Sequence, residues 1–168
     1  RQARVLVPIV LLGACRTLPN GDVSICLRRA EEMAQTPDWP QVRAALEEAD
    51  KAGPGASAER MAQAAAFGAL MGARGNSGVI TSQILKGIEA GFVGKKRFNG
   101  LDLAHALSEG AKTAYGAVAK PVEGTILTVI GGAADAAVER AEQVNDLEAV
   151  LMTAVDTAEK SVARTPSL

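Results

Sequence analysis

Residues 71–83 read MGARGNSGVITSQ and interrupt a chain that is otherwise rich in alanine and leucine. Apolar residues recur at helical spacing on both sides of this stretch. Its three glycines permit positive φ angles and close backbone approach, and glycine destabilises the interior of a helix. The stretch therefore predicts a bend between two packed helices, the first beginning at Ser57 and the second at Ser77 or Gly78.

The composition favours a helical domain built without large aromatic side chains. The chain has 168 residues, of which 48% are hydrophobic and only 3% aromatic. A core of Ala, Leu, Val and Ile suits close packing between helices. The chain has a net charge of −1 and lacks the clustered basic residues that nucleic-acid binding requires. Its one short basic run, Lys95–Arg97, is interpreted as a solvated loop.

Helical periodicity continues along most of the chain, and no segment alternates as a strand does. We expect one all-α domain over residues 1–168, an antiparallel barrel or bundle of about eight amphipathic helices. Glycine, proline and asparagine mark the breaks between helices. The expected helices are 4–14, 24–35, 39–51, 57–71, 77–90, 101–119, 125–144 and one from Asn145 or Asp146 to 164.

The N-terminal stretch RQARVLVPIVLLGAC has two interpretations. Two arginines before a short apolar run that ends at Cys15 resemble a bacterial lipoprotein signal. The run is too short to span a bilayer and contains Pro8, so a buried first helix is the simpler interpretation. Cys15 and Cys26 do not form a disulfide framework or a metal-binding spacing, which favours a reduced, cytoplasmic protein.

Three turns carry the residues that could do chemistry. In GARGNSG, backbone amides at a helix start together with the Ser77 hydroxyl could wrap a phosphate, although an ordinary interhelical turn has similar composition. In KPVEGTILT, residues Glu123, Thr125 and Thr128 could face a site, although Thr125 alone is more often a plain helix cap. In PNGDV, Asn20 and Asp22 offer oxygen ligands for Mg²⁺, although turns favour these residues anyway.

Together the three turns suggest a composite site at one end of the bundle. The single histidine, His105, lies among apolar neighbours on an expected helix and is interpreted as structural. No nucleophile–histidine arrangement can be built from it, so no catalytic side chain is assigned.

The segments MGARGNSGVITSQILKG, AYGAVAKPVEGTILTV and the near-terminal ARTP resemble the nucleotide-binding L domain of dihydroxyacetone kinases. The closer resemblance is to the N-terminal ATP-binding domain of bacterial fatty acid kinase, and it is strong over residues 57–166. It implies an all-α barrel of eight helices with ATP or ADP at one end. It also implies that the first loop holds the phosphates and the second borders the nucleotide, which implicates Gly75, Asn76, Ser77, Gly78, Gly124 and Thr125.

The family's acidic turn holds Mg²⁺ through its aspartates, and this chain departs from that pattern. Asp22 matches one metal-binding aspartate, whereas Asn20 replaces the other with a neutral amide. The residues from Val23 to Cys26 also lose the family's Thr-Gly-Thr-Asn segment. The resemblance therefore implies an intact phosphate loop beside an altered metal turn.

Two functions follow as expectations from the resemblance. The first is the ATP-binding domain of a kinase that phosphorylates a small acceptor, either a fatty acid carboxylate presented by an acyl-binding partner protein or glycerone. In such a kinase the acceptor oxygen attacks the γ-phosphorus directly, and no protein nucleophile is needed. The alternative, motivated by Asn20, is a catalytically impaired nucleotide-binding module that regulates or contacts another protein. A helical interaction domain without nucleotide is disfavoured by the intact GARGNSG loop.

Overall fold

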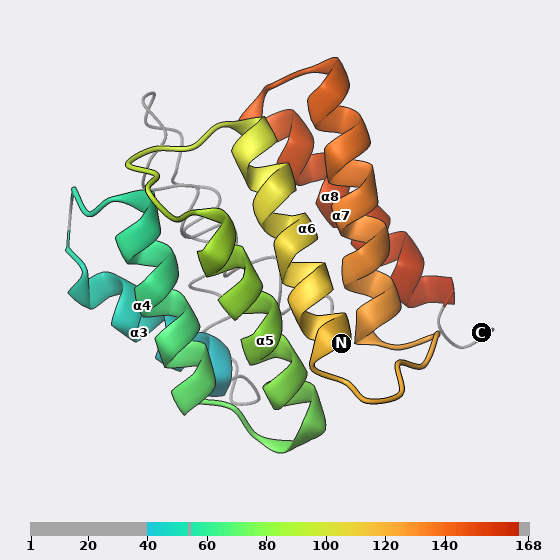
Figure 1. Ribbon diagram of the computed structural model, residues 1–168, viewed down its shortest axis with the longest axis horizontal. Helices are drawn as coiled ribbons and strands as arrows, with labels where there is room; N and C mark the ends of the chain where they lie inside the picture. The colour runs from blue at the N-terminus through green and yellow to red at the C-terminus, as the bar shows by residue number, and fades with distance from the viewer. Residues whose placement is uncertain (1–39, 54, 165–168) are drawn as a thin grey trace.

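The computed structural model describes residues 40–53 and 55–164. This part of the chain contains six α-helices and no strand (Figure 1). The all-α prediction is confirmed for these residues. The helices are α3 (Pro40–Lys51), α4 (Ala58–Met71), α5 (Gly75–Gly91), α6 (Gly100–Gly116), α7 (Ile126–Gln143) and α8 (Leu147–Arg164).

Each helix packs against the next one along the chain, and α8 also packs against α6. Successive helices run in opposite directions, so the connections alternate between the two ends of the bundle (Figure 1). The α4–α5 and α6–α7 connections lie at the lower end in Figure 1, and the other three lie at the upper end. Two of the turns singled out in the sequence are therefore at the same end, as expected.

Aliphatic side chains fill the core between these helices. The largest fully buried side chains come from five of the six described helices: Val42, Ile84, Leu103, Ile130 and Val150. Between α5 and α6 the backbones themselves approach closely, because a Cβ added at Gly87 would lie 2.6 Å from Gly110 Cα. Small residues thus bring these two helices close enough for their neighbours to interdigitate.

Six of the eight expected helices are confirmed, with two shifts at their ends. α5 begins at Gly75 and not at Ser77 or Gly78, because Gly75 enters the helix from a left-handed φ of 62°. α6 ends at Gly116 and not near 119, since glycine is a poor helix former and Pro121 disfavours helix just before it. The expected helices over 4–14 and 24–35 lie outside the described residues, so the closed barrel of eight stays a prediction.

No helix within residues 40–53 and 55–164 is both long enough and apolar enough to cross a membrane. The expected solvated loop at Lys95–Arg97 is confirmed, since all three residues are exposed between α5 and α6.

Candidate functional site

The glycine-rich loop between α4 and α5 presents its middle residues to solvent. Gly75, Asn76 and Ser77 form the first turn of α5, and all three are exposed. The residue before them, Arg74, occupies the N-cap position with extended backbone and makes no side-chain cap hydrogen bond. The first amides of a helix lack intrahelical acceptors, and the helix dipole is positive there. This turn therefore has the character of an anion-binding surface.

Packing closes this loop at Gly78 but not at Gly75. Gly78 is buried, and its amide already donates to the Arg74 carbonyl at 3.2 Å. A Cβ at position 78 would lie 3.2 Å from the carbonyl carbon of Ala73, which leaves little room for a side chain. At Gly75, by contrast, a Cβ would meet nothing within 4 Å, and only the positive φ requires glycine.

Arg74 turns its guanidinium back over the end of α4. Its Nη1 donates to the carbonyl of Ala73 at 2.7 Å and to that of Met71 at 3.4 Å. The last carbonyls of a helix carry the negative end of its dipole, so this cation neutralises them. The arginine thereby stabilises the bend from which α5 begins.

A second turn, between α6 and α7, is held by a network of hydrogen bonds. The Thr128 hydroxyl donates to Glu123 Oε2 at 2.7 Å and accepts from the Gly124 amide at 3.0 Å. Thr125 Oγ1 donates to the Val122 carbonyl at 2.7 Å and accepts from the Leu127 amide at 3.3 Å. The expected cap role of Thr125 is thus confirmed, and Gly124 has the positive φ of 74° that the turn needs.

Tyr115 on α6 borders this second turn. A Cβ at Gly131 of α7 would lie 3.7 Å from its hydroxyl oxygen, so the ring lies along α7. Burial raises the pKa of the Tyr115 hydroxyl, and the negative charges of Glu123 and Asp135 raise it further, against a hydrogen bond with Thr128 that lowers it. The tyrosine therefore stays protonated at neutral pH and is sensitive to charge at the turn.

The opposite end of the bundle is closed by side chains and loop carbonyls. α4, α6 and α8 begin there, and each has an acidic residue in its first turn, namely Glu59, Asp102 and Glu148. Asn99 and Asp102 form a capping box. Other first-turn amides are also accepted there: Arg60 by Ser57 Oγ, Ala58 by the Lys96 carbonyl, Leu101 by Asn145 Oδ1 and Ala149 by Asp146 Oδ1.

The lower end differs in its charge. α3, α5 and α7 begin there, and none of them has an acidic residue in its first turn. An acidic side chain in a first turn stabilises a helix, and the first turns of these three helices lack that contribution. Sequence reasoning missed this asymmetry, although the first turns could have been compared once the helices were assigned.

Residues 41–168 match a known domain family, the DAK2 domain. The chain belongs to the DAK2 domain family. DAK2 domains are the ATP-binding domains of the dihydroxyacetone kinase family and in general bind ADP or ATP with magnesium. The family expectation drawn from the loop motifs is confirmed at this level.

Curated bacterial relatives match part of this chain. Protein YloV of Bacillus subtilis is 48% identical over 109 residues, which are 65% of this chain and 20% of that protein. An uncharacterized protein of Staphylococcus haemolyticus is 50% identical over 101 residues, which are 60% of this chain and 18% of that protein. The chain therefore spans about a fifth of the length of these relatives.

Other predicted site residues of the DAK2 domain have different outcomes. Asn20 and Asp22 lie outside the described residues, so their metal role stays a prediction. Within the described ranges, no group of three or more His, Cys, Asp or Glu side chains could hold a metal ion. His105 lies on α6 as expected, but its side chain is exposed and not packed among apolar neighbours.

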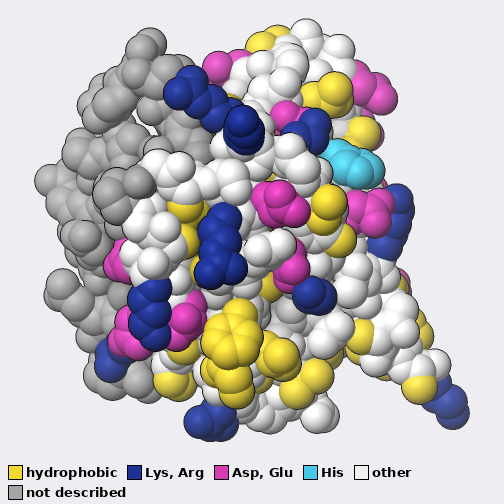
Figure 2. Space-filling view, turned by 60° about the vertical axis from the view of Figure 1, so that its left-hand side comes forward, with side chains coloured by type: hydrophobic (Ala, Val, Ile, Leu, Met, Phe, Trp, Pro, Cys, Tyr) yellow, Lys and Arg dark blue, Asp and Glu magenta, His cyan; other side chains and the backbone are white. Residues whose placement is uncertain are grey.

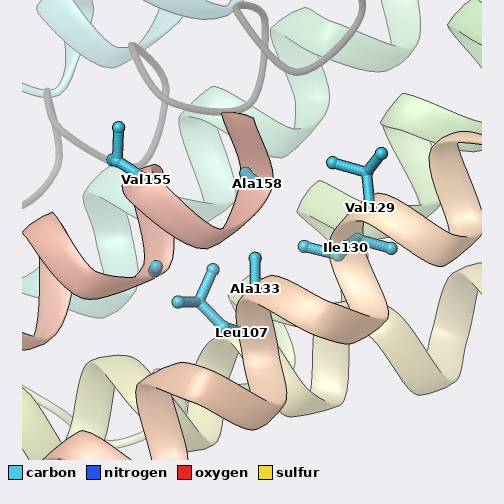
Figure 3. Close-up of a pocket in the computed structure, with 7 residues that line it drawn as sticks. Leu107, Val129, Ile130, Ala133, Val155 and Ala158 are labelled. Atoms are coloured by element: carbon cyan, nitrogen blue, oxygen red, sulfur yellow. The ribbon is translucent and has the colours of Figure 1, made fainter. Parts of the chain in front are cut away.

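The DAK2 domain also has two apolar features. One is an apolar hollow between α6, α7 and α8 (Figure 3), lined by Leu107, Val129, Ile130, Ala133, Ala154, Val155 and Ala158. None of its lining residues belongs to the α4–α5 or α6–α7 connection. The other is a set of exposed hydrophobic side chains on α4 and the start of α5, namely Phe67, Leu70, Met71 and Val79. Figure 2 shows hydrophobic side chains gathered near the lower edge of the face in view.

Proposed function

We propose that this chain is the ATP-binding domain of a kinase and that the nucleotide's phosphates bind at the first turn of α5. The observation that carries the proposal is the open N-terminus of α5 within GARGNSG. Gly75, Asn76 and Ser77 are exposed there, with neither a side-chain cap from Arg74 nor an acidic residue in the turn. Membership of the DAK2 family supports a nucleotide as the source of the anion.

The residues of the two turns would contribute to nucleotide binding in different ways. Gly75, Asn76 and Ser77 would supply backbone amides and a hydroxyl to phosphate oxygens. Gly78 would contribute by its missing side chain, because its amide is already bonded to Arg74. Gly124 and Thr125, at the same end of the bundle, would border the nucleotide, with Thr125 holding the turn through its cap.

The acceptor that we propose is a fatty acid carboxylate presented by an acyl-binding partner protein, with glycerone as the substrate of the wider family. This assignment rests on the loop motifs in the sequence. Transfer of the γ-phosphoryl group to a carboxylate oxygen needs positioning and charge neutralisation, and no protein nucleophile. Any Mg²⁺ bound with the nucleotide would supply neutralising charge, and Asp22 and Asn20 are the residues proposed to approach it.

Asn20 also favours a second candidate function. A neutral amide in place of an aspartate lowers the attraction for Mg²⁺. A domain that kept the phosphate turn but bound metal weakly would bind nucleotide with little turnover. Such a domain would act as a nucleotide-dependent regulatory or interaction module.

Calorimetric titration of the 168-residue chain with ATP, with and without Mg²⁺, tests both functions. The kinase domain predicts binding that strengthens with Mg²⁺, and the variant Asn20→Asp should strengthen it further. The regulatory module predicts binding that ignores Mg²⁺. If ATP does not bind under either condition, both functions are wrong.

A further inference from the structure

One side chain from α3 reaches across both helices that flank the glycine-rich loop. Gln41 Nε2 donates to the Ala69 carbonyl of α4 at 2.9 Å and to the Gly78 carbonyl of α5 at 2.8 Å. The glutamine is half-buried, and its two partners lie 28 and 37 residues away in the chain. A primary amide has two N–H donors, so both are used in this bridge.

The two acceptors lie on either side of the loop. Ala69 is in the last turn of α4, where helix carbonyls lack intrahelical donors. The amides that follow it bond elsewhere: Gly72 donates to the Gly68 carbonyl and Ala73 to the Leu70 carbonyl. The Gln41 amide therefore donates to the Ala69 carbonyl, to which neither the Gly72 nor the Ala73 amide donates.

The acceptor on α5 belongs to the residue that directly follows the exposed turn. Gly78 comes immediately after Ser77, and a Cβ at Gly78 would lie 3.4 Å from Gln41 Oε1. The glutamine side chain thus packs against the one residue of GARGNSG that is buried in the first turn of α5. A single planar amide thus bridges the end of α4 and the start of α5.

We propose that Gln41 is a positioning residue for nucleotide phosphates. By holding Ala69 and Gly78 in register, it sets the direction in which the amides of Gly75, Asn76 and Ser77 point, without itself reaching the phosphate. This inference rests on the proposed function. It assigns a role in the proposed phosphate site to a residue of α3, which lies outside both turns.

The test compares Gln41→Met with a control that destabilises the bundle elsewhere. Methionine keeps the length and volume of glutamine but has no N–H donor. Val150→Ala removes a fully buried side chain from α8 and leaves the loop untouched. For each full-length variant, the affinity for ATP, the thermal midpoint and the backbone amide chemical shifts of the nucleotide-free protein are measured.

Gln41→Met should weaken ATP binding by about fivefold or more, the effect of misplacing charge-assisted hydrogen bonds. The amide shifts of residues 75–77 should move in the same variant without nucleotide. Val150→Ala should lower the thermal midpoint by at least as much as Gln41→Met does. It should nevertheless leave the affinity for ATP and the amide shifts of residues 75–77 unchanged. Gln41→Asn, whose amide is shorter by one methylene and should not bridge both carbonyls, should reproduce the loss of affinity and provides a second variant if Gln41→Met does not fold.

Two results would overturn the inference, and they are distinguishable. If Gln41→Met and Gln41→Asn bind ATP as the unaltered chain does, Gln41 is not a positioning residue, and the proposed function stands. If the unaltered chain does not bind ATP, the proposed function fails and the positioning role fails with it. Any shift changes at residues 75–77 would then reflect a structural brace alone.

Discussion

The side chains of Glu123 and Thr128 are joined by a 2.7 Å hydrogen bond across the turn that begins α7. The same threonine hydroxyl accepts from the Gly124 amide at 3.0 Å, so it fixes the glycine whose φ is positive. One hydroxyl therefore supports the backbone of the second turn at the proposed nucleotide end. A change at Thr128 should disturb this turn more than an equal change elsewhere on the bundle.

We expect Thr128→Val to lower the free energy of unfolding by about 1–2 kcal/mol, because the isosteric side chain leaves the half-buried Gly124 amide without this acceptor. Thr153→Val is the matched control. Its hydroxyl donates to the Ala149 carbonyl within α8, and its loss should cost about 0.5 kcal/mol or less. Denaturant unfolding measures both, and equal losses would show that Thr128 has no special role at the turn.

Asn76→Asp should separate binding from stability by moving them in opposite directions. A carboxylate in the first turn of α5 interacts favourably with the helix dipole and should raise the unfolding free energy by about 0.3–1 kcal/mol. The same charge should repel phosphates and weaken ATP binding. Leu101→Asp adds the same charge to the first turn of α6 at the opposite end, where it should leave ATP affinity unchanged. Equal affinities in Asn76→Asp and the unaltered chain would argue against phosphate at α5.

Gly75→Ala tests whether conformation or space requires the glycine. The site is open to a Cβ, so the cost should come from the φ of 62° alone and reach about 1–2 kcal/mol of unfolding free energy. Gly75→Asn should cost less, since asparagine tolerates the left-handed region better than alanine does. If alanine is as stable as glycine by denaturant unfolding, the left-handed start of α5 is not required.

The ionisation of Tyr115 reports on the charge at the second turn. Tyr115 is the single tyrosine of the sequence, so ultraviolet titration of its phenolate is unambiguous. Its pKa should lie above the ordinary value of 10.0, and Glu123→Gln should lower it by removing a negative charge. Glu142→Gln, farther along α7, is the control and should leave the pKa unchanged. If Glu123→Gln leaves the Tyr115 pKa unchanged, the described arrangement of the turn is wrong.

The raised pKa also has a consequence for stability with a definite sign. A phenol whose pKa is higher in the folded state than in the unfolded state keeps its proton longer when folded. The unfolded chain then loses its proton first, so the free energy of unfolding falls as pH rises above the unfolded value and toward the folded pKa. Tyr115→Phe should lack this component of the alkaline decline.

The breaks between helices were predictable because they depend on local chemistry. Glycine, proline and capping residues mark each of them, and Thr125 caps α7 as its position before an apolar run predicts. The start of α5 at Gly75 is harder to predict, because a left-handed glycine that opens a helix looks like a glycine inside a loop. The end of α6 is harder to predict, because Pro121 is the strongest stop signal in the sequence but the helix already ends at Gly116.

The bracing of the loop could not be predicted from the sequence. Gln41 bonds to residues 28 and 37 positions away, and nothing near it in the sequence distinguishes it from an exposed glutamine. Its role depends on tertiary packing that brings α3 against both α4 and the start of α5. The residues of GARGNSG could be singled out in advance, whereas the contacts that aim their amides could not.

The central claim is that the first-turn amides of α5 bind the phosphates of ATP. The most direct measurement is amide chemical-shift mapping of the 168-residue chain as ATP and Mg²⁺ are added. We predict that Gly75, Asn76 and Ser77 shift most, with Gly124 and Thr125 next, and that the capped amides of Ala58, Leu101 and Ala149 stay in place. Saturating ATP that leaves residues 75–77 unshifted would contradict the account.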